Sequence, residues 1–196
     1  VCAPVQRLDA HLGELRTASE DDLDASRAAT RALLAEVMEA VGLALAPLGE
    51  EEVELVHRAM AGSLARTESA LGLMARMAGD HEDARGHLVR ALHLATLVDD
   101  VGAERKAMRR LGVLALHAGN HDRAYDLCST AAEQPAKEAL DALPSLVLAG
   151  ITARLLGRQE DAERWITRAA KVLAEAPGKG AAALDRVGQS LLAVDR

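Results

Sequence analysis

The chain has 196 residues, of which 49% are hydrophobic and 27% are charged, and its formal net charge is -7. The acidic balance argues against binding nucleic acid through the phosphate backbone, because that mode needs a basic face. The chain contains no phenylalanine, one tryptophan and one tyrosine. Because sheet cores are filled largely by aromatic and β-branched side chains, this composition excludes an all-β fold and favours helices.

Hydrophobic periodicity and turn signals predict a chain made of helices. The expected helices lie at about 5–17, 20–46, 50–78, 81–98, 102–118, 121–133, 137–156, 159–175 and 181–194. Residues 177–180 give the clearest turn signal, and a break is expected before Pro144. Residues 1–60 carry 5 basic and 12 acidic side chains, whereas residues 61–196 carry 18 of each, so the acidic excess lies in the N-terminal third.

A short turn motif occurs three times. In each copy a glycine is followed by a polar pair, an acidic residue, a further charged residue and then an alanine, as in Gly79–Ala84, Gly119–Ala124 and Gly157–Ala162. The glycine suits the end of one helix, and the acidic residues suit the first turn of the next. Each copy therefore predicts a tight helical hairpin.

Small residues stand at fixed distances around these turns. In each copy, a pair that contains a small residue begins thirteen residues before this alanine. Another alanine lies seven residues after the same alanine. The pairs are Leu71–Gly72, Leu111–Gly112 and Ala149–Gly150, and the later alanines are Ala91, Ala131 and Ala169. Leu12–Gly13, Ala25 and Ala32 show the same spacing near the N-terminus. Glycine inside a helix costs roughly 1 kcal/mol relative to alanine, so its recurrence indicates that another helix approaches closely there.

This pattern resembles the tetratricopeptide repeat, whose most persistent small positions are matched by Leu71, Gly72, Ala84 and Ala91 and their equivalents. The resemblance implies a right-handed α-solenoid of antiparallel helix pairs, with about four repeats and a C-terminal capping helix. One domain over residues 1–196 is expected. Its copies fall at about 5–46, 63–98, 102–134 and 137–175, with a linking long-helix region at 46–62 and a cap at 181–194.

The repeat periods are longer than is usual for this family, whose repeat has about 34 residues. The intervals from Ala25 to Ala84, from Ala84 to Ala124 and from Ala124 to Ala162 all exceed that length. Such periods resemble those of helical sensor regions in bacterial regulators. The first interval is by far the longest and predicts two long helices, and an inserted extra hairpin is the alternative.

No catalytic constellation or metal site is expected. His117 and His121 are four residues apart, as in helical zinc pairs, but a predicted turn separates them and no third ligand is evident. Asp99 and Asp100 lie at a predicted interhelix turn, where carboxylates favour exposed backbone amides. The sequence also lacks a phosphate-binding loop and a nucleophile elbow. We therefore expect neither enzymatic activity nor a cofactor.

The resemblance implies that the first helix of each pair lines a concave groove. The residues assigned to this groove are Arg66, Ser69, Leu73, Arg76, Met77, Lys106, Arg109, Arg110, Val113, Leu116, His117, Val147, Ile151 and Arg154. Basic and apolar side chains in one groove suit an acidic peptide or protein segment. The alternative is that these are ordinary solvated charges flanking a packing stripe.

Three functional hypotheses follow. The first is a non-catalytic protein-interaction module, a sensor or scaffold segment of a bacterial cytoplasmic regulatory protein. The second is self-association as a homodimer through residues 20–60, which carry apolar positions such as Leu33, Val37 and Met38. The third is a small-molecule sensor or an enzyme built inside the superhelix. No apolar run approaches the ~18 residues that span a bilayer, so no membrane association is expected.

Overall fold

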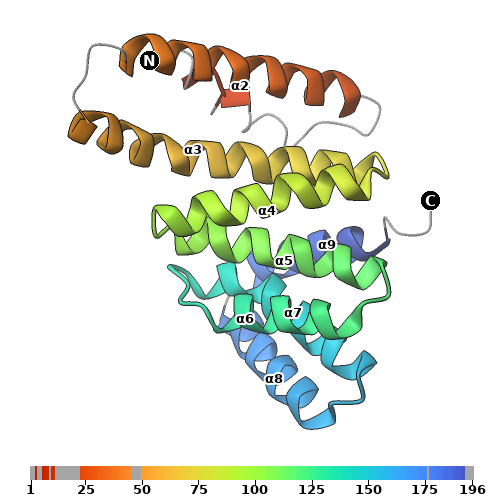
Figure 1. Cartoon of the computed structure of the whole chain (residues 1–196). Helices are drawn as coiled ribbons and strands as arrows, with labels where there is room; N and C mark the ends of the chain where they lie inside the picture. The colour runs from red at the N-terminus through yellow and green to blue at the C-terminus, as the bar shows by residue number, and fades with distance from the viewer. Residues whose placement is uncertain are drawn as a thin grey trace. The chain divides into compact units, whose positions relative to one another are not determined.

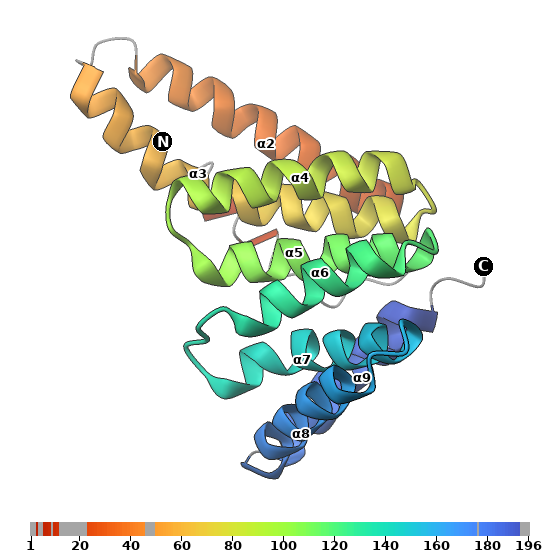
Figure 2. The same ribbon diagram turned by 60° about the horizontal axis from the view of Figure 1, so that its bottom comes forward.

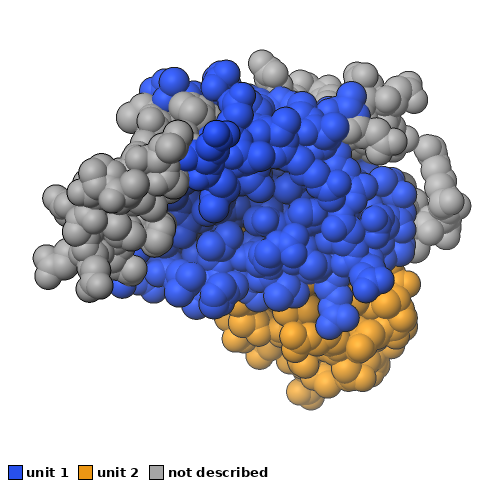
Figure 3. Space-filling view, turned by 45° about the horizontal axis from the view of Figure 1, so that its top comes forward, with its two compact units in different colours: residues 1–100 blue, residues 101–196 orange. Residues whose placement is uncertain are grey.

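The computed structural model describes residues 3, 6–8, 10–11, 23–45, 50–175 and 177–192. Every described secondary-structure element is an α-helix, and consecutive helices pack in antiparallel order within residues 23–97 and within residues 101–192 (Figures 1 and 2). The predicted all-α fold of sequential helix pairs is therefore confirmed. The chain divides into two compact units, Val1–Asp100 and Val101–Arg196, which are coloured separately in Figure 3.

The first unit contains three long helices: α2 (Leu23–Leu45), α3 (Glu50–Met77) and α4 (His81–Leu97). Helix α3 runs without interruption for 28 residues. The structure therefore shows the predicted long helix rather than an extra hairpin between residues 50 and 77. Helix α4 packs against α3. The buried side chains of this pair include Leu71, Met74 and Leu88.

The second unit contains α5 (Val101–His117), α6 (His121–Glu133), α7 (Ala139–Leu155), α8 (Gln159–Glu175) and α9 (Pro177–Leu192). Each of α5 to α8 packs against the next helix in the sequence, and α9 packs against α7 and α8. The core is filled by leucines and alanines around two aromatic residues, Tyr125 and the fully buried Trp165. Burial of this kind stabilises a fold by roughly 25 cal/mol per Å² of apolar surface.

The three predicted turns share one geometry. Gly79, Gly119 and Gly157 have φ angles of 80°, 71° and 71°, the left-handed region that glycine adopts without a steric penalty. At the first turn the amide of Gly79 donates to the carbonyl of Arg76 (3.0 Å), and the amide of Asp80 donates to that of Ala75 (2.9 Å). The other two turns repeat this pair of bonds. Each turn is therefore a Schellman C-cap, as the glycine spacing predicted.

The glycines inside the first helices mark close helix contacts, and their surroundings are equivalent. A Cβ atom built on Gly72 would lie 2.7 Å from Cγ of Leu88, sixteen residues later. On Gly112 it would lie 2.5 Å from Sγ of Cys128, and on Gly150 it would lie 3.1 Å from Cγ1 of Ile166, again sixteen residues later. The alanines at the two repeated positions of each second helix are buried as well: Ala84, Ala91, Ala124, Ala131, Ala162 and Ala169. The small residues thus let the two helices of each pair nest, as their register predicted.

Two local expectations were wrong. Residues 177–180 form the first turn of α9 rather than a loop, because proline fits the first turn of a helix. A Cβ on Gly180 would lie 2.6 Å from Cδ1 of Leu173, so this glycine marks a close approach of α9 to α8. Helix α7 also continues through Pro144 without a break.

The small-residue register is not repeated in α2. Ala25 and Ala32, the predicted counterparts of the buried alanines, are exposed, whereas Thr30 and Val37 are buried. Leu12 and Gly13 lie outside the described residues. Helix α2 is therefore held on its neighbours by different contacts.

Candidate functional site

The structure places the predicted groove residues on α3, α5 and α7, the first helices of three pairs. Their exposure differs widely. Arg66, Met77, Lys106 and Arg154 are exposed, whereas Ser69, Arg76 and Val113 are buried. The half-buried members are Leu73, Arg109, Arg110, Leu116, His117, Val147 and Ile151. Fewer of the predicted groove side chains are thus exposed than the sequence suggested.

Arg76 illustrates the difference. Its side chain has a relative exposure of 8% at the end of α3, and burial away from water lowers the pKa of its guanidinium. A long cationic side chain with so little exposed surface acts mainly within the fold. Its repeat-equivalent on α7, Arg154, is exposed.

Helices α5 and α7 lie beside each other in the second unit. Two positions on these helices are equivalent in the repeat when they are as far apart in sequence as Ala124 and Ala162. Arg109 on α5 therefore corresponds to Val147 on α7. Lys106 is exposed one helical turn before Arg109 and Arg110. The basic and apolar side chains of the two helices together form a set that we call the α5–α7 face: Lys106, Arg109, Arg110, Val147, Ile151 and Arg154. Four of its six members are cationic, on a chain whose net charge is -7.

A buried arginine ties the ends of α5 and α7 together. Arg105 has a relative exposure of 6%, and its Nη1 donates to the backbone oxygen of Pro135 over 2.8 Å. Its Nη2 lies 3.9 Å from the carboxylate of Asp141, at the start of α7. This arrangement fixes the helix that carries the basic residues of the α5–α7 face.

The second unit also holds the two aromatic residues of the chain. The hydroxyl of Tyr125 on α6 donates to Asp161 on α8 over 2.9 Å, and the guanidinium of Arg158 lies over the tyrosine ring at 4.6 Å. Arg164 and Arg168 lie over the ring of Trp165 at 4.5 and 5.0 Å. These cation–π contacts cover the aromatic part of the core.

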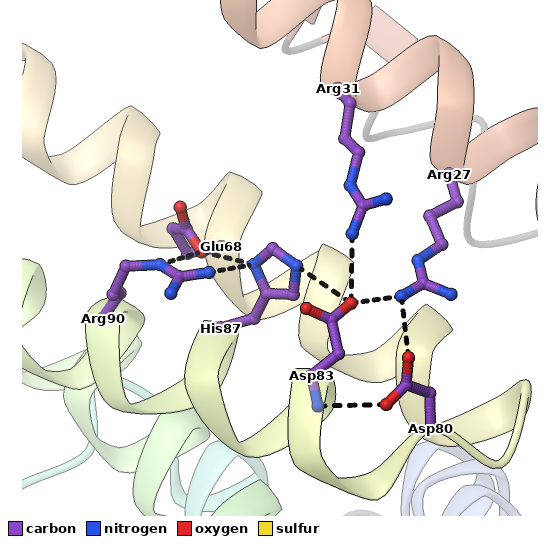
Figure 4. A network of polar contacts seen from close by, with 7 residues as sticks. All are labelled: Arg27, Arg31, Glu68, Asp80, Asp83, His87 and Arg90. Atoms are coloured by element: carbon purple, nitrogen blue, oxygen red, sulfur yellow. Dashed lines mark hydrogen bonds and ion pairs between the residues drawn. The ribbon is translucent and has the colours of Figure 1, made fainter.

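A polar network in the first unit was not predicted from the sequence (Figure 4). Arg27 and Arg31 project from α2 toward the start of α4, where both guanidinium groups contact the carboxylate of Asp83; the Arg31 distance is 3.0 Å. Arg27 also lies 3.5 Å from Asp80, which caps α4 by accepting from the amide of Asp83. The network continues through His87 on α4 to Glu68 on α3, so α2, α3 and α4 all contribute to this cluster.

The imidazole of His87 is buried between two carboxylates. Its Nδ1 lies 2.6 Å from Glu68 on α3, and its Nε2 lies 3.5 Å from Asp83. Arg90 donates from Nε to the same Glu68 oxygen over 3.1 Å, and its Nη2 lies 2.8 Å from Nδ1 of His87. A signal was present in the sequence, since acidic Asp83 and basic His87 and Arg90 have helical spacing. Their partners on α2 and α3 are not local.

The charges of this network act on Asp83. Partial burial of the carboxyl opposes its ionisation, but the hydrogen bond from Arg27 and the positive charges of His87, Arg27 and Arg31 outweigh it, so the pKa of Asp83 is lowered. A lowered carboxyl pKa stabilises the folded state at pH values above the ordinary value of 3.8. That contribution is lost as the pH falls through the folded-state pKa.

No group of three or more histidine, cysteine or acidic side chains among the described residues could hold a metal ion. An open surface hollow lies at the start of α8, lined by Arg158, Gln159, Glu160 and Asp161. None of the described helices has both the length and the apolar character needed to cross a membrane.

No protein-family model matches this sequence, and no curated protein sequence is significantly similar to it. The solved structures that are similar to this chain include the following two. BtubC (BKLC) from P. vanneervenii has a TM-score of 0.61 and 18% sequence identity, and the similarity covers 81% of this chain and 59% of that one. MamA protein has a TM-score of 0.46 and 17% identity, over 91% of this chain and 96% of that one.

The similarity to BtubC establishes the class of fold. The chain is an all-helical protein of paired helices and is structurally similar to proteins that contain tetratricopeptide repeats. It spans somewhat more than half of the length of BtubC. Folds of this class generally mediate contacts between proteins.

Proposed function

We propose that this chain is a non-catalytic protein-interaction module that binds an acidic peptide or protein segment on the α5–α7 face. The observation that carries the proposal is the basic character of this face on an acidic chain, with Lys106 and Arg154 exposed beside half-buried Val147 and Ile151. Cations on a partly apolar surface attract acidic side chains and give them an apolar surface to cover. The paired-helix fold supports the same kind of function.

The long repeat periods, from Ala84 to Ala124 and from Ala124 to Ala162, support a more specific role. They resemble those of helical regions in bacterial regulators, so we place the module in the sensor or scaffold segment of a cytoplasmic regulatory protein. Its contribution there is to bring an acidic segment of a second protein to the regulator. Charge attraction would speed this association and make it dependent on salt.

The test is a pull-down with the full chain and the double variant Lys106→Glu and Arg154→Glu. Both side chains are exposed, so reversing their charge leaves the core intact. Lys171→Glu, an exposed lysine on α8, is the matched control. Partners that the wild type and the control capture, and that the double variant loses, support the proposal. Capture by all three proteins alike would remove the α5–α7 face from it.

Self-association through residues 20–60 is a second candidate function. Met38 on α2 has 52% of its surface exposed, which is high for a large apolar side chain. Sedimentation velocity at two concentrations of the wild type and of Met38→Glu tests it. A species that is monomeric at both concentrations would exclude this function.

A further inference from the structure

His87 on α4 is a buried histidine whose two ring nitrogens both face carboxylates (Figure 4). The residue has a relative exposure of 6%. A carboxylate oxygen of Glu68 on α3 lies 2.6 Å from Nδ1, and one of Asp83 lies 3.5 Å from Nε2. A neutral imidazole carries one proton, so it donates from only one of its two nitrogens. Only the charged ring can donate to both carboxylates.

The short contact with Glu68 places the first proton on Nδ1. A ring nitrogen and a carboxylate oxygen come within 2.6 Å of each other only with a proton between them. The same oxygen already accepts from Nε of Arg90 over 3.1 Å, so His87 supplies this proton. Nη2 of Arg90 also lies 2.8 Å from Nδ1, but a protonated nitrogen has no lone pair to accept with. In the neutral ring, Nε2 is therefore the nitrogen without a proton.

The surroundings of Nε2 favour a second proton. This atom is buried, and none of the described residues makes a hydrogen bond to it. The lone pair of a neutral ring would face the negative charge of Asp83, whereas a protonated Nε2 would donate toward it. Although partial burial of the carboxyl acts in the other direction, the positive charge of His87 is among the causes that lower the pKa of Asp83.

Asp83 is also the residue that holds α2. Arg27 and Arg31 of α2 both contact its carboxylate, and a carboxylate can accept from several donors at once. A charged His87 fixes this carboxylate in place for the two guanidinium groups and links it to α3 through Glu68. The described charged groups around His87 come from all three helices: Arg27 and Arg31 from α2, Glu68 from α3, and Asp80, Asp83 and Arg90 from α4.

We propose that the charge of His87 controls the attachment of α2, which the protonated ring holds on the α3–α4 pair and the neutral ring releases. Histidine side chains ordinarily change their charge between pH 5 and 8. The stabilisation is present where the ring is protonated and is lost as the pH rises through this range. Release would expose Val37, which is now buried. This device lies in the first unit and does not rest on the α5–α7 face.

The test is hydrogen exchange of the full chain across that pH range, corrected for the pH dependence of the intrinsic exchange rate. We expect the protection of Leu23–Leu45 to fall about tenfold as the pH rises, with a much smaller change in α7 and α8. His87→Gln removes the titrating ring, so the protection of α2 should no longer depend on pH. His93→Gln, at an exposed histidine on the same helix, is the matched control and should behave as the wild type does.

His11 needs a control of its own, because its Nε2 lies 3.0 Å from Oγ1 of Thr30 on α2. The pH dependence should persist in His11→Gln. Its loss there, together with its persistence in His87→Gln, would overturn the proposal.

The wild type provides a test that needs no substitution. Nitrogen chemical shifts report the charge of the His87 ring, which should become neutral over the same pH range in which α2 loses protection. An α2 whose protection does not change with pH would overturn the proposal. An equal loss of protection in α7 and α8 would overturn it too, because the effect would then not be local to the contact of α2 with α4.

Discussion

The glycines of this chain divide into two kinds that the sequence alone does not separate. Gly72 and Gly86 both lie inside helices of the first unit, but only Gly72 is in close contact with a neighbouring helix. Around Gly86 the nearest described atom is Nη1 of Arg90, at 3.6 Å from the position of a Cβ atom. The two positions should therefore respond in opposite ways to the same substitution.

We expect Gly72→Ala to destabilise the fold and Gly86→Ala to stabilise it. The methyl group on residue 72 would meet Leu88 at 2.7 Å and the carbonyl oxygen of Ala84 at 3.1 Å, and overpacking of this kind costs about 1–3 kcal/mol. Alanine at residue 86 gains about 1 kcal/mol of helix propensity without a clash. Urea denaturation measures both changes, and a stabilised Gly72→Ala would contradict the close approach of α3 and α4.

Asp99 occupies a position where glycine is favoured. Its φ angle is 54°, and the amide of Asp100 donates to the carbonyl of Ala95 over 3.0 Å, as in the three glycine turns. Asp99→Gly should therefore raise the free energy of unfolding by up to about 1 kcal/mol. Asp99→Val should lower it, because a β-branched residue disfavours positive φ. Thermal unfolding of the two variants should shift in opposite directions, and shifts in the same direction would exclude this explanation.

Cys128 is buried in the core of the second unit, and we expect its thiol to be unreactive at neutral pH. Burial raises the pKa of its thiol from the ordinary 9.0 to about 12, although the positive charge of Arg109 acts in the other direction. The folded protein therefore keeps the thiol protonated where the unfolded chain ionises. Its contribution to stability is complete below pH 9.0 and declines as the pH rises toward about 12. In a Cys2→Ser background, we expect a disulfide reagent to label Cys128 in urea and not in native buffer at neutral pH. Rapid native labelling would contradict its burial.

At the scale of the element, α2 differs from the helices that follow it. The pairs from α3 onward nest through small residues, whereas α2 is linked to the start of α4 by Arg27 and Arg31. Surface ion pairs generally contribute little, but Asp83 receives two guanidinium groups and lies beside a buried imidazole. The contact is thus more sensitive to charge than the nested pairs are.

We expect Asp83→Asn to loosen α2 without unfolding the α3–α4 pair. The substitution removes the negative charge that faces Arg27, Arg31 and His87. Hydrogen exchange should accelerate across Leu23–Leu45 and change less across α4. In the wild type, hydrogen exchange across α2 should accelerate in the same way as the pH falls below 3.8. The lowered pKa of Asp83 delays protonation of its carboxylate to that range. Asp122→Asn, at an exposed pair with Arg158, is the control, and an equal effect there would contradict this role of Asp83.

At the scale of the whole molecule, stability should be local. Helical-repeat chains are stabilised mainly within a repeat and at its neighbours, and this chain divides into two compact units. Gly72→Ala should therefore accelerate hydrogen exchange in α3 and α4 much more than in α7 and α8. A uniform acceleration along the chain would instead indicate one cooperative unit.

The sequence by itself determined the helical pairing of residues 63–175. Turn glycines and small residues at fixed spacing act over a few helical turns, so the Schellman caps and the close approaches at Gly72, Gly112 and Gly150 could be predicted from local pattern. The same pattern also predicted which helices carry Lys106 and Arg154, because the helix boundaries follow from the turn signals.

Only the tertiary structure decided the rest. Ser69 and Arg76 have the same helical spacing as exposed groove residues, yet both are buried, because burial depends on which helices meet rather than on spacing along one helix. The contacts of Arg27 and Arg31 with Asp83 join residues more than fifty positions apart, and no local pattern encodes such a pair. Likewise, Gly188 matches Gly150 in sequence, but only the structure shows that a Cβ atom on Gly150 would lie 3.1 Å from Cγ1 of Ile166, whereas one on Gly188 would have no described atom within 4 Å.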